Sequence, residues 1–363
     1  MVPALVLDAC LRAGARRAEA GEFTRRAYLH GKMDLVQVEA VADMIEARSR
    51  AHHRAALGQL ERGLSARVVG LRDGILRLEA QLVHHIDFPE EDDAPVPLDR
   101  ISAGADALLA QIVAMLETAP EGALLREGAL AVLAGRPNVG KSSLYNALLG
   151  EERAIVTDTP GTTRDALEAT VQMGGYPFRL VDTAGMREEG EHIERLGIEV
   201  AKRYLARADL VLLCVEAGAE LSEEERLFLE SVSEVPCVLV ETKGDLGGGS
   251  VGYEGPVAGR VRVSVETGEG LGALRALLPE LVFAGLVQSG GEAPVLTRRR
   301  QAEGMTVAAE EVEAFAAAVA DGVPAELAAT HLRAASGALE EVIGVVPLDE
   351  VLDAVFREFC VGK

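Results

Sequence analysis

Hydrophobic residues recur every three or four positions through the first third of the chain. The longest such pattern runs from Leu57 to Leu82, and it predicts one long helix with a single apolar seam. An acidic segment, 87–93, interrupts the pattern, and helical spacing resumes over Leu98–Glu117. Three more helical patterns follow towards the C-terminal end, over Thr306–Ala320, Ala325–Ile343 and Leu348–Phe359. Both ends of the chain are therefore predicted to be helical.

The middle of the chain has a different pattern, in which short apolar runs alternate with helical spacing. The runs are Ala129–Leu133, Ala166–Met173, Tyr176–Val181, Cys237–Val240 and Gly259–Val263. Gly174 and Gly175 separate two of them and predict a β-hairpin. Such alternation is typical of an α/β nucleotide-binding domain. A Gly- and Ser-rich segment, 285–292, marks the expected junction with the helices that follow, so the α/β domain is predicted to be inserted into a helical one.

Composition and charge limit the function classes. The 363 residues suffice for two or three domains, and no uninterrupted apolar run approaches the ~18 residues of a membrane span. A net charge of −22 argues against general affinity for nucleic acid. The first 86 residues, however, carry 13 Lys and Arg against 10 Asp and Glu, so an RNA contact would be local. Its candidates are two arginine clusters, for each of which a solvent-exposed helix face is the alternative: Arg12, Arg16, Arg17, Arg25 and Arg26, and Arg298, Arg299 and Arg300.

The four cysteines are scattered and form no C-x-x-C pair. Cys214 and Cys237 lie in apolar runs, which predicts buried small hydrophobic residues. No signal-peptide pattern heads the chain. These features predict a soluble, cytoplasmic protein with no membrane partner.

The segment Gly135–Ser142 reads G-R-P-N-V-G-K-S and lies between an apolar run and a helical pattern, as a phosphate-binding P-loop does. Backbone N–H groups of such a loop converge on phosphates, and the helix N-terminus adds a favourable dipole. Lys141 is predicted to reach the β- and γ-phosphates, and the Ser142 hydroxyl to bind Mg²⁺. The predicted nucleotide contacts of this loop are Asn138, Val139, Gly140, Lys141, Ser142 and Ser143.

Three later segments, each after an apolar run, identify the base. Asp182, Thr183, Ala184 and Gly185 form the first, in which the aspartate can support Mg²⁺ and the Gly185 N–H can meet the γ-phosphate. Thr242, Lys243, Gly244 and Asp245 form the second, whose carboxylate matches the N1–H and N2–H₂ donors of guanine. Ser264, Val265 and Glu266 are the last base-loop candidate, with a plain strand-to-turn transition as the alternative. Thr242 stands where this motif usually has Asn, which predicts a weaker brace between the base loop and the P-loop.

Several motifs together resemble the MnmE, or TrmE, family of bacterial tRNA-modifying GTPases. The matching segments cover nearly the whole chain: G-E-F-T-R-R-A-Y-L-H-G-K-M-D-L at 21–35, the P-loop, G-T-T-R-D at 161–165, Asp182–Gly185, and F-C-V-G-K at 359–363. The resemblance implies a K⁺-stimulated GTP hydrolase that acts with MnmG on the wobble uridine (position 34) of tRNA, adding a carboxymethylaminomethyl or aminomethyl group at C5. It also implies that the G domains associate with one another in the GTP state.

The resemblance also assigns residues near the γ-phosphate. Met186 occupies the position at which many small GTPases place a water-orienting Gln, and Arg164 is a candidate arginine finger. The resemblance instead implies a K⁺ ion bound by Asn138, Thr157, Thr159 and Thr162, and Mg²⁺ bound by Ser142 and Thr163. It implies further GTP contacts from Thr157, Asp158, Thr159, Pro160, Gly161, Thr162 and Thr163. It selects Glu194 as the general base, where spacing alone leaves Glu188, Glu189 and Glu191 open.

Family members begin with a β-rich domain that binds a tetrahydrofolate derivative and forms a constitutive dimer. Met1 aligns close to the end of that domain, so we expect only its last part here, and impaired folate binding and constitutive dimerisation. Lys32 and Lys363 match folate contacts, with surface lysines as the alternative. Cys360 is a candidate for the tRNA-modification centre, with a packed cysteine as the alternative.

The predicted fold is therefore an α/β P-loop GTPase (G) domain inserted into an all-α helical domain, with a remnant of an N-terminal α+β domain. The predicted boundaries are 1–35 for the remnant, 36–125 for the first helical part, 126–284 for the G domain and 285–363 for the second helical part. Two alternatives carry different functions: a ribosome-assembly GTPase of the Era/Der type, and a truncated, non-catalytic scaffold gated by nucleotide.

Overall fold

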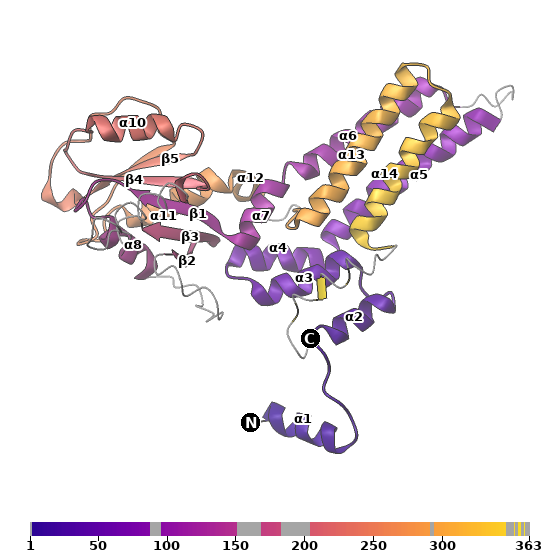
Figure 1. Ribbon diagram of the computed structural model, residues 1–363, viewed down its shortest axis with the longest axis horizontal. Helices are drawn as coiled ribbons and strands as arrows, with labels where there is room; N and C mark the ends of the chain where they lie inside the picture. The colour runs from indigo at the N-terminus through magenta and orange to yellow at the C-terminus, as the bar shows by residue number, and fades with distance from the viewer. Residues whose placement is uncertain are drawn as a thin grey trace, which may run out of the picture. The chain divides into compact units, whose positions relative to one another are not determined.

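The computed structural model describes residues 2–87, 96–150, 168–182, 204–290 and 294–345, together with positions 352, 355, 356 and 359. The chain divides into two compact units, which are described separately. The helical unit comprises residues 1–46, 55–119 and 294–363, and the sheet unit comprises residues 47–54 and 120–293 (Figure 1). A sheet-containing unit thus interrupts a helical one along the chain, which confirms the predicted fold class of a G domain with a helical domain.

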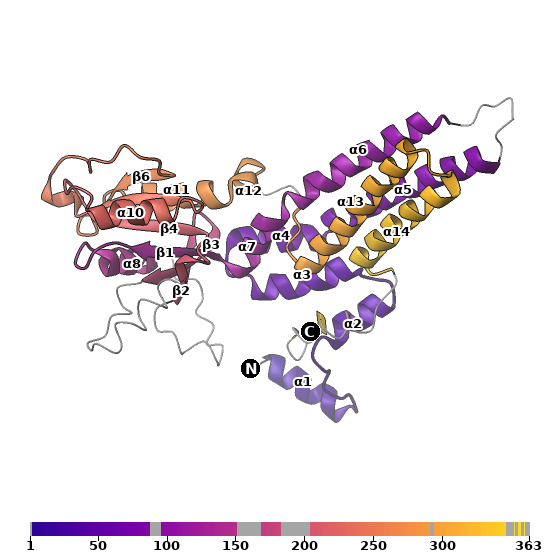
Figure 2. The ribbon, with the colours of Figure 1, turned by 45° about the horizontal axis from the view of Figure 1, so that its top comes forward.

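Four long helices make up most of the helical unit (Figure 2): α5 (Gly63–Asp87), α6 (Leu98–Leu116), α13 (Arg299–Ala320) and α14 (Ala325–Ile343). Helix α14 packs on α5 and α13, and α6 also packs on both of these. Their facing apolar side chains form one core, which includes Leu71, Ile75, Ile112, Phe315 and Leu339. Burial of such faces, more than intrinsic propensity, stabilises helices in proteins.

The single helix predicted over Leu57–Leu82 is wrong, because the seam is divided between two helices. Helix α4 (Arg50–Leu60) ends before Arg62, which has a left-handed φ of 70°, and α5 begins at Gly63. A Cβ at Gly63 would lie 2.9 Å from the carbonyl oxygen of Gly58, so glycine permits this close turn. The seam residues from Leu64 to Leu82 are buried as predicted, whereas Leu57 is 37% exposed.

Within the described residues, one helical stretch, Leu98–Glu127, is long and apolar enough to cross a membrane by length and mean hydropathy, which is 1.3. It contains α6 and α7 (Ala119–Glu127). Ile101, Ala105, Ile112 and Met115 bury one face of α6 in the helical core. Leu98, Leu108, Leu109 and Leu116 are partly buried against the same core and add to the mean hydropathy.

A smaller cluster joins the N-terminal helices to C-terminal residues of the same unit. After α1 (Val2–Arg12), the helices α2 (Glu22–Leu29) and α3 (Leu35–Glu46) bury side chains together with four positions of the last segment, Leu352, Val355, Phe356 and Phe359. Tyr28 donates a hydrogen bond to the carbonyl oxygen of Gly344 at 2.7 Å. That residues 1–35 are the end of a separate domain stays a prediction.

The sheet unit contains a six-stranded sheet in the order β2-β3-β1-β4-β5-β6. Its strands are β1 (Ala129–Ala134), β2 (Glu168–Met173), β3 (Tyr176–Asp182), β4 (Leu210–Glu216), β5 (Cys237–Thr242) and β6 (Gly259–Arg262). All neighbouring pairs are parallel except β2 and β3, which form the predicted hairpin. The carboxyl ends of β1, β3, β4, β5 and β6 therefore meet at one edge, where α/β proteins bind ligands.

Helices cover the sheet from both sides. Helix α10 (Glu223–Ser231) packs Leu229 against one face, while α8 (Lys141–Gly150) and α11 (Leu271–Val282) also contact strands; α8 and α10 lie on opposite sides of the sheet (Figure 1). Helix α12 (Ala284–Gln288) covers the first half of the segment expected to be the junction. The sheet unit continues to residue 293.

Candidate functional site

The loop between β1 and α8 has backbone angles that favour glycine at both ends. Gly135 has a φ of 134°, and a Cβ there would lie 2.3 Å from the carbonyl oxygen of Cys214. Gly140 has a φ of 99°. Asn138, at the middle of the loop, is left-handed with a φ of 63°, a conformation that asparagine adopts more readily than most residues. The P-loop glycines are therefore required by the fold of the loop itself.

Lys141 lies inside this loop and is only 5% exposed. Its Nζ donates hydrogen bonds to the carbonyl oxygens of Gly135 at 2.8 Å and Arg136 at 2.6 Å. The buried ammonium is thereby held over the loop at the N-terminus of α8. A phosphate that enters the loop meets a positive charge and a helix N-terminus together.

Ser142 follows Lys141 on α8 and contacts the end of β3. Its hydroxyl donates to Asp182 Oδ2 at 2.6 Å, and Asp182 is 5% exposed. Parallel pairing places Leu133 of β1 opposite Asp182, so the topology brings the aspartate to the P-loop. A hydroxyl and a carboxylate are hard oxygen donors of the kind that Mg²⁺ prefers, so these two side chains fit the predicted ion.

Thr242 connects the end of β5 to the P-loop. It is 2% exposed, and its Oγ1 donates to the carbonyl oxygen of Val139 and lies 3.1 Å from that of Val215. Thr242, although its side chain is shorter than that of asparagine, therefore still reaches the P-loop. Whether nucleotide affinity is weaker than with asparagine stays a prediction.

The remaining base-loop candidates lie beside Thr242. Lys243 is left-handed with a φ of 54° and forms an ion pair with Glu216 at 2.9 Å. Asp245 is exposed and accepts a 2.7 Å hydrogen bond from Ser264 Oγ, while Gly244 N donates to Val263 O. Val265 and Glu266 are exposed in the turn that follows. The structure thus brings Asp245 and Ser264 together at the same edge of the sheet as the P-loop.

Several predicted site residues lie outside the described part of the chain. They are Thr157, Asp158, Thr159, Pro160, Gly161, Thr162 and Thr163, then Thr183, Ala184, Gly185 and Glu194, and finally Cys360 and Lys363. Lys32 is described and lies exposed in the turn after α2. Among the described residues, Asn138 is therefore the one predicted K⁺ ligand, and Lys32 is the one predicted folate contact.

Sequence reasoning did not identify the ion pair between Arg136 and Glu225. Arg136 Nε donates to Glu225 Oε1 at 2.8 Å, and this carboxylate also accepts from the backbone N–H of Ser222 in the capping box of α10. The P-loop is thus tied to the N-terminus of α10. The capping sequence S-E-E-E was a usable signal for the helix start, but nothing in it pointed to Arg136.

The prediction that the arginine triplet forms an RNA contact or a solvent-exposed helix face is wrong for Arg298 and Arg300. Arg298 is buried and pairs with Asp43 at 2.7 Å, and Arg300 pairs with Glu39 at 2.9 Å. Arg299 alone is exposed, and it pairs with Glu303 one turn further on.

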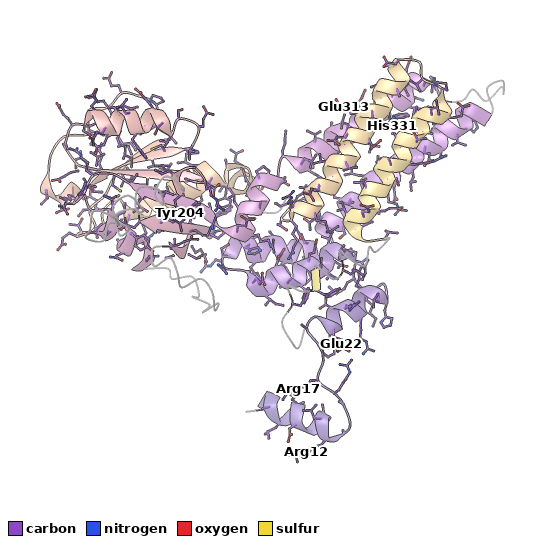
Figure 3. The ribbon with its side chains drawn as sticks, in the orientation of Figure 1. Arg12, Arg17, Glu22, Tyr204, Glu313 and His331 are labelled. Atoms are coloured by element: carbon purple, nitrogen blue, oxygen red, sulfur yellow. The ribbon has the colours of Figure 1, made fainter. Side chains whose placement is uncertain are left out.

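In the N-terminal cluster, Arg12 pairs with Asp8, and Arg16 pairs with Glu22 and lowers the pKa of that carboxyl to about 2. Figure 3 shows Arg12, Arg17 and Glu22 near α1 and α2. This group, together with Arg25 and Arg26, stays the candidate for a local RNA contact.

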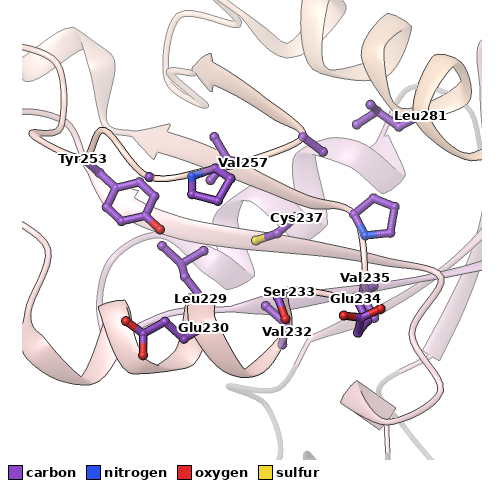
Figure 4. Close-up of a pocket in the computed structure, with 14 residues that line it drawn as sticks. Leu229, Glu230, Val232, Ser233, Glu234, Val235, Cys237, Tyr253, Val257 and Leu281 are labelled. Atoms are coloured by element: carbon purple, nitrogen blue, oxygen red, sulfur yellow. The ribbon is translucent and has the colours of Figure 1, made fainter.

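A separate cavity of about 810 Å³ lies at the opposite end of β5 from Thr242 (Figure 4). Leu229, Cys237 and Tyr253 contribute to its lining. Burial raises the pKa of Cys237 to about 11 and that of Cys214 to about 12, so both thiols stay protonated, as predicted for buried small hydrophobic residues. The cavity does not belong to the nucleotide site.

Comparison with known proteins identifies relatives over nearly the whole chain. The family model for the MnmE helical domain matches residues 35–360. Proteins called tRNA modification GTPase MnmE are 42% identical over 369 residues in Heliobacterium modesticaldum and 41% identical over 370 residues in Moorella thermoacetica. The alignments cover 98% and 99% of this chain and 78% and 79% of those relatives.

Proposed function

Because this chain belongs to the MnmE family of tRNA modification GTPases, we propose that its GTP hydrolysis is stimulated by K⁺ and serves modification of the wobble uridine together with MnmG. The chain is a GTP hydrolase that acts in tRNA modification, and its family favours this function over the Era/Der and scaffold alternatives. The observation that supports the proposed site is the meeting of three motifs at one sheet edge. Lys141, the Ser142–Asp182 contact and the Thr242–Val139 contact all lie at the carboxyl ends of parallel strands.

The described residues divide the work of holding the nucleotide. Lys141 exchanges its two loop carbonyls for the β- and γ-phosphates, and the loop N–H groups with the α8 N-terminus bind the same charge. Ser142, with Asp182 beside it and Thr163 from the following segment, would hold the Mg²⁺ that neutralises the phosphates. Asp245, oriented by Ser264, accepts the N1–H and N2–H₂ of guanine. The other proposed nucleotide contacts among the described residues are Val139, Gly140, Ser143, Lys243, Gly244, Val265 and Glu266. The family resemblance adds Thr157–Thr163 and Thr183–Gly185.

Replacing Asp245 by Asn tests the base assignment. The amide offers one donor and one acceptor where the carboxylate offers two acceptors, so it matches xanthine better than guanine. We expect Asp245→Asn to lose GDP affinity by about 100-fold and to gain affinity for XDP, as two charge-assisted hydrogen bonds change partners. Titration with labelled GDP and XDP measures both. An unchanged preference for GDP would overturn the base assignment.

K⁺ would supply the positive charge that balances the β–γ bridge during hydrolysis. Its proposed ligands are Asn138, Thr157, Thr159 and Thr162, and Asn138 is the described member. Asn138 lies in the left-handed region at the middle of the P-loop, and its amide oxygen is a hard donor. Met186 cannot orient water as a glutamine would, so another group must stabilise the charge that develops in the transition state.

Turnover in K⁺ and in Na⁺ at equal ionic strength tests the ion. We expect several-fold faster GTP hydrolysis in K⁺. Asn138→Gly removes the amide while glycine accepts the same φ, so it should abolish the K⁺ advantage and leave GDP affinity nearly intact. Equal rates in the two salts, or a K⁺ advantage that survives in Asn138→Gly, would refute this assignment.

Glu194 is the proposed general base, acting through a bridging water. Glu194→Ala should abolish turnover with GTP affinity nearly unchanged, and Glu191→Ala is the matched control because it removes a neighbouring acid. Loss of nucleotide binding in Glu194→Ala would show that the residue is structural. Loss of turnover in the control alone would move the role to Glu191.

The further proposals concern the modification reaction. tRNA is the substrate of the family, and MnmG is the proposed partner in adding the carboxymethylaminomethyl or aminomethyl group at uridine C5. G domains are proposed to associate in the GTP state, in the cytoplasm. Cys360 is proposed near the modification centre, and Lys32 and Lys363 as contacts to a tetrahydrofolate derivative. Copurification of MnmG with this chain, and transfer of labelled carbon to tRNA, test these proposals.

A further inference from the structure

A buried carboxylate lies directly before the base motif and organises the loop that follows it. Glu241 is the penultimate residue of β5 and is 2% exposed. It accepts hydrogen bonds from Ser250 Oγ at 2.8 Å, from Val251 N at 3.0 Å and from Arg262 Nε at 3.2 Å. Burial alone would raise the pKa of Glu241, but these hydrogen bonds outweigh it and lower the pKa below its ordinary value. Glu241 is therefore ionised at neutral pH and held by these three hydrogen bonds.

Arg262 connects this carboxylate to the base motif. It lies opposite Glu241 in the β5–β6 pairing, and its guanidinium also donates to the carbonyl oxygens of Gly248 and Gly249. Its stem lies against Gly244, where a Cβ would approach Arg262 Cγ to 2.9 Å. One side chain thus contacts the glycine between Lys243 and Asp245 and the loop after them.

The motif needs such support because part of it is strained. Lys243 is left-handed, an unfavourable conformation for a non-glycine residue that persists only where surrounding contacts hold it. The loop at Gly248 packs directly on Gly218, which follows β4; a Cβ on Gly218 would lie 3.0 Å from Gly248 Cα. Arg262 holds this loop through two carbonyls, so it stabilises the motif from the side away from the P-loop.

We propose that Arg262 is a positioning residue for guanine recognition, which keeps Asp245 in place by packing on Gly244 and by holding the 248–249 carbonyls while Glu241 fixes its guanidinium. The inference rests on the proposed role of Asp245. Arg262 acts through the loop and does not touch the base. Loss of the Arg262 guanidinium should therefore reduce the discrimination between bases by Asp245 more than it reduces the affinity for phosphate.

The test compares affinities for GDP and IDP, since IDP lacks only the 2-amino group that Asp245 recognises. Arg262→Met keeps much of the stem and removes the guanidinium. We expect the GDP:IDP affinity ratio to fall about 5- to 10-fold, as when one charge-assisted hydrogen bond is weakened, with little change for IDP. Arg262→Lys keeps the charge without the fork, and it should give a smaller decrease in the ratio.

Arg260→Met is the matched control. Arg260 lies two residues earlier on the same strand, and its guanidinium binds the carbonyl oxygens of Val251 and Tyr253 and the hydroxyl of Ser250. It also lies 4.0 Å from Glu241, so the two variants share the carboxylate and differ in their contacts with the base motif. Its side chain is 32% exposed, compared with 40% for Arg262. Because Arg262 and Val263 supply the atoms nearest to the Cβ position of Gly244, the control should leave the ratio unchanged.

The outcomes separate the two levels of the proposal. A folded Arg262→Met protein with an unchanged ratio overturns the inference, as does an equal decrease in Arg260→Met. If Arg262→Met does not fold, the ratio in Arg262→Lys decides in the same way. Asp245→Asn is measured in parallel: if it too leaves the ratio unchanged, the proposed base site itself has failed, whereas a change confined to Asp245→Asn rejects only the role of Arg262.

Discussion

The buried pair of Arg298 and Asp43 allows a structural role to be distinguished from an RNA-binding role. The perturbation is Asp43→Asn, which keeps the shape of the side chain and removes its charge. Arg298 Nη2 donates to Asp43 Oδ1 at 2.7 Å, and the two side chains are 7% and 1% exposed. The substitution therefore leaves a nearly buried guanidinium without this carboxylate.

The expected magnitude follows from that burial. Breaking a buried ion pair by removing one partner costs about 3–5 kcal/mol, far more than breaking an exposed pair. For a unit of roughly 180 residues, each kcal/mol lowers Tm by about 2–4 °C, so a decrease of roughly 6–20 °C is expected. The double variant Asp43→Leu/Arg298→Met should recover much of this loss, because it removes both buried charges.

Scanning calorimetry with and without GDP provides the assay. A ligand that binds the folded state raises the transition of the unit that holds it, so the transition that GDP does not raise reports the helical unit. Arg299→Met is the control, since Arg299 is 91% exposed and should produce no measurable shift. A helical transition unchanged in Asp43→Asn would refute the reasoning. An Arg298→Met protein with unchanged Tm but weaker, less salt-dependent tRNA binding would restore the RNA-contact hypothesis.

Three further predictions concern the sheet unit. Thr242→Val removes the hydroxyl that reaches Val139 O, and the GDP-sensitive transition should show a loss of about 1–2 kcal/mol; an unchanged transition would show that the hydroxyl does not brace the loops. Arg136→Met removes the ion pair with Glu225 and should raise the rate of amide exchange at the start of α10 relative to Arg136→Lys; equal exchange in the two variants would dismiss the coupling. The pKa of Glu241 is lowered in the folded state, so the ionised carboxylate stabilises the fold above its ordinary pKa of about 4.5, and this stabilisation is lost as pH falls below that value. The difference in unfolding free energy between the native chain and Glu241→Gln should therefore shrink from pH 6 to pH 3. A difference that stays constant over this range would contradict the prediction.

The sequence predicted the sheet unit well because its signals are local. Apolar runs that begin after glycine or proline predict strands, and the observed β1, β3 and β5 begin where those runs begin. The hairpin followed from Gly174 and Gly175, both of which have positive φ. Phosphate and base motifs are contiguous in sequence, so their placement needed only the order of parallel strands.

The errors arose where distant residues decide the structure. The spacing from Leu60 to Leu64 continues the apolar seam, yet the chain turns between them at Arg62, which has a φ of 70°, and Gly63 permits the close approach to Gly58. Arg298 pairs with an aspartate 255 residues away, so a local run of three arginines could not reveal which of them is buried. Likewise, the sequence shows Glu241 only as a polar residue after the apolar run of β5, and its partners come from the following loop and β6.

The interrupted order of the helical unit has a consequence for synthesis on the ribosome. Helix α6 ends at Leu116, but α13, on which it packs, begins only at Arg299. At translation rates of 5–20 residues per second, about 10–40 s separate the two helices. The sheet unit, which is nearly contiguous, can fold during this interval, while the apolar faces of α5 and α6 await their partners. Nascent chains of this protein should therefore depend on chaperones until α13 and α14 have emerged, even after the nucleotide-binding unit has formed.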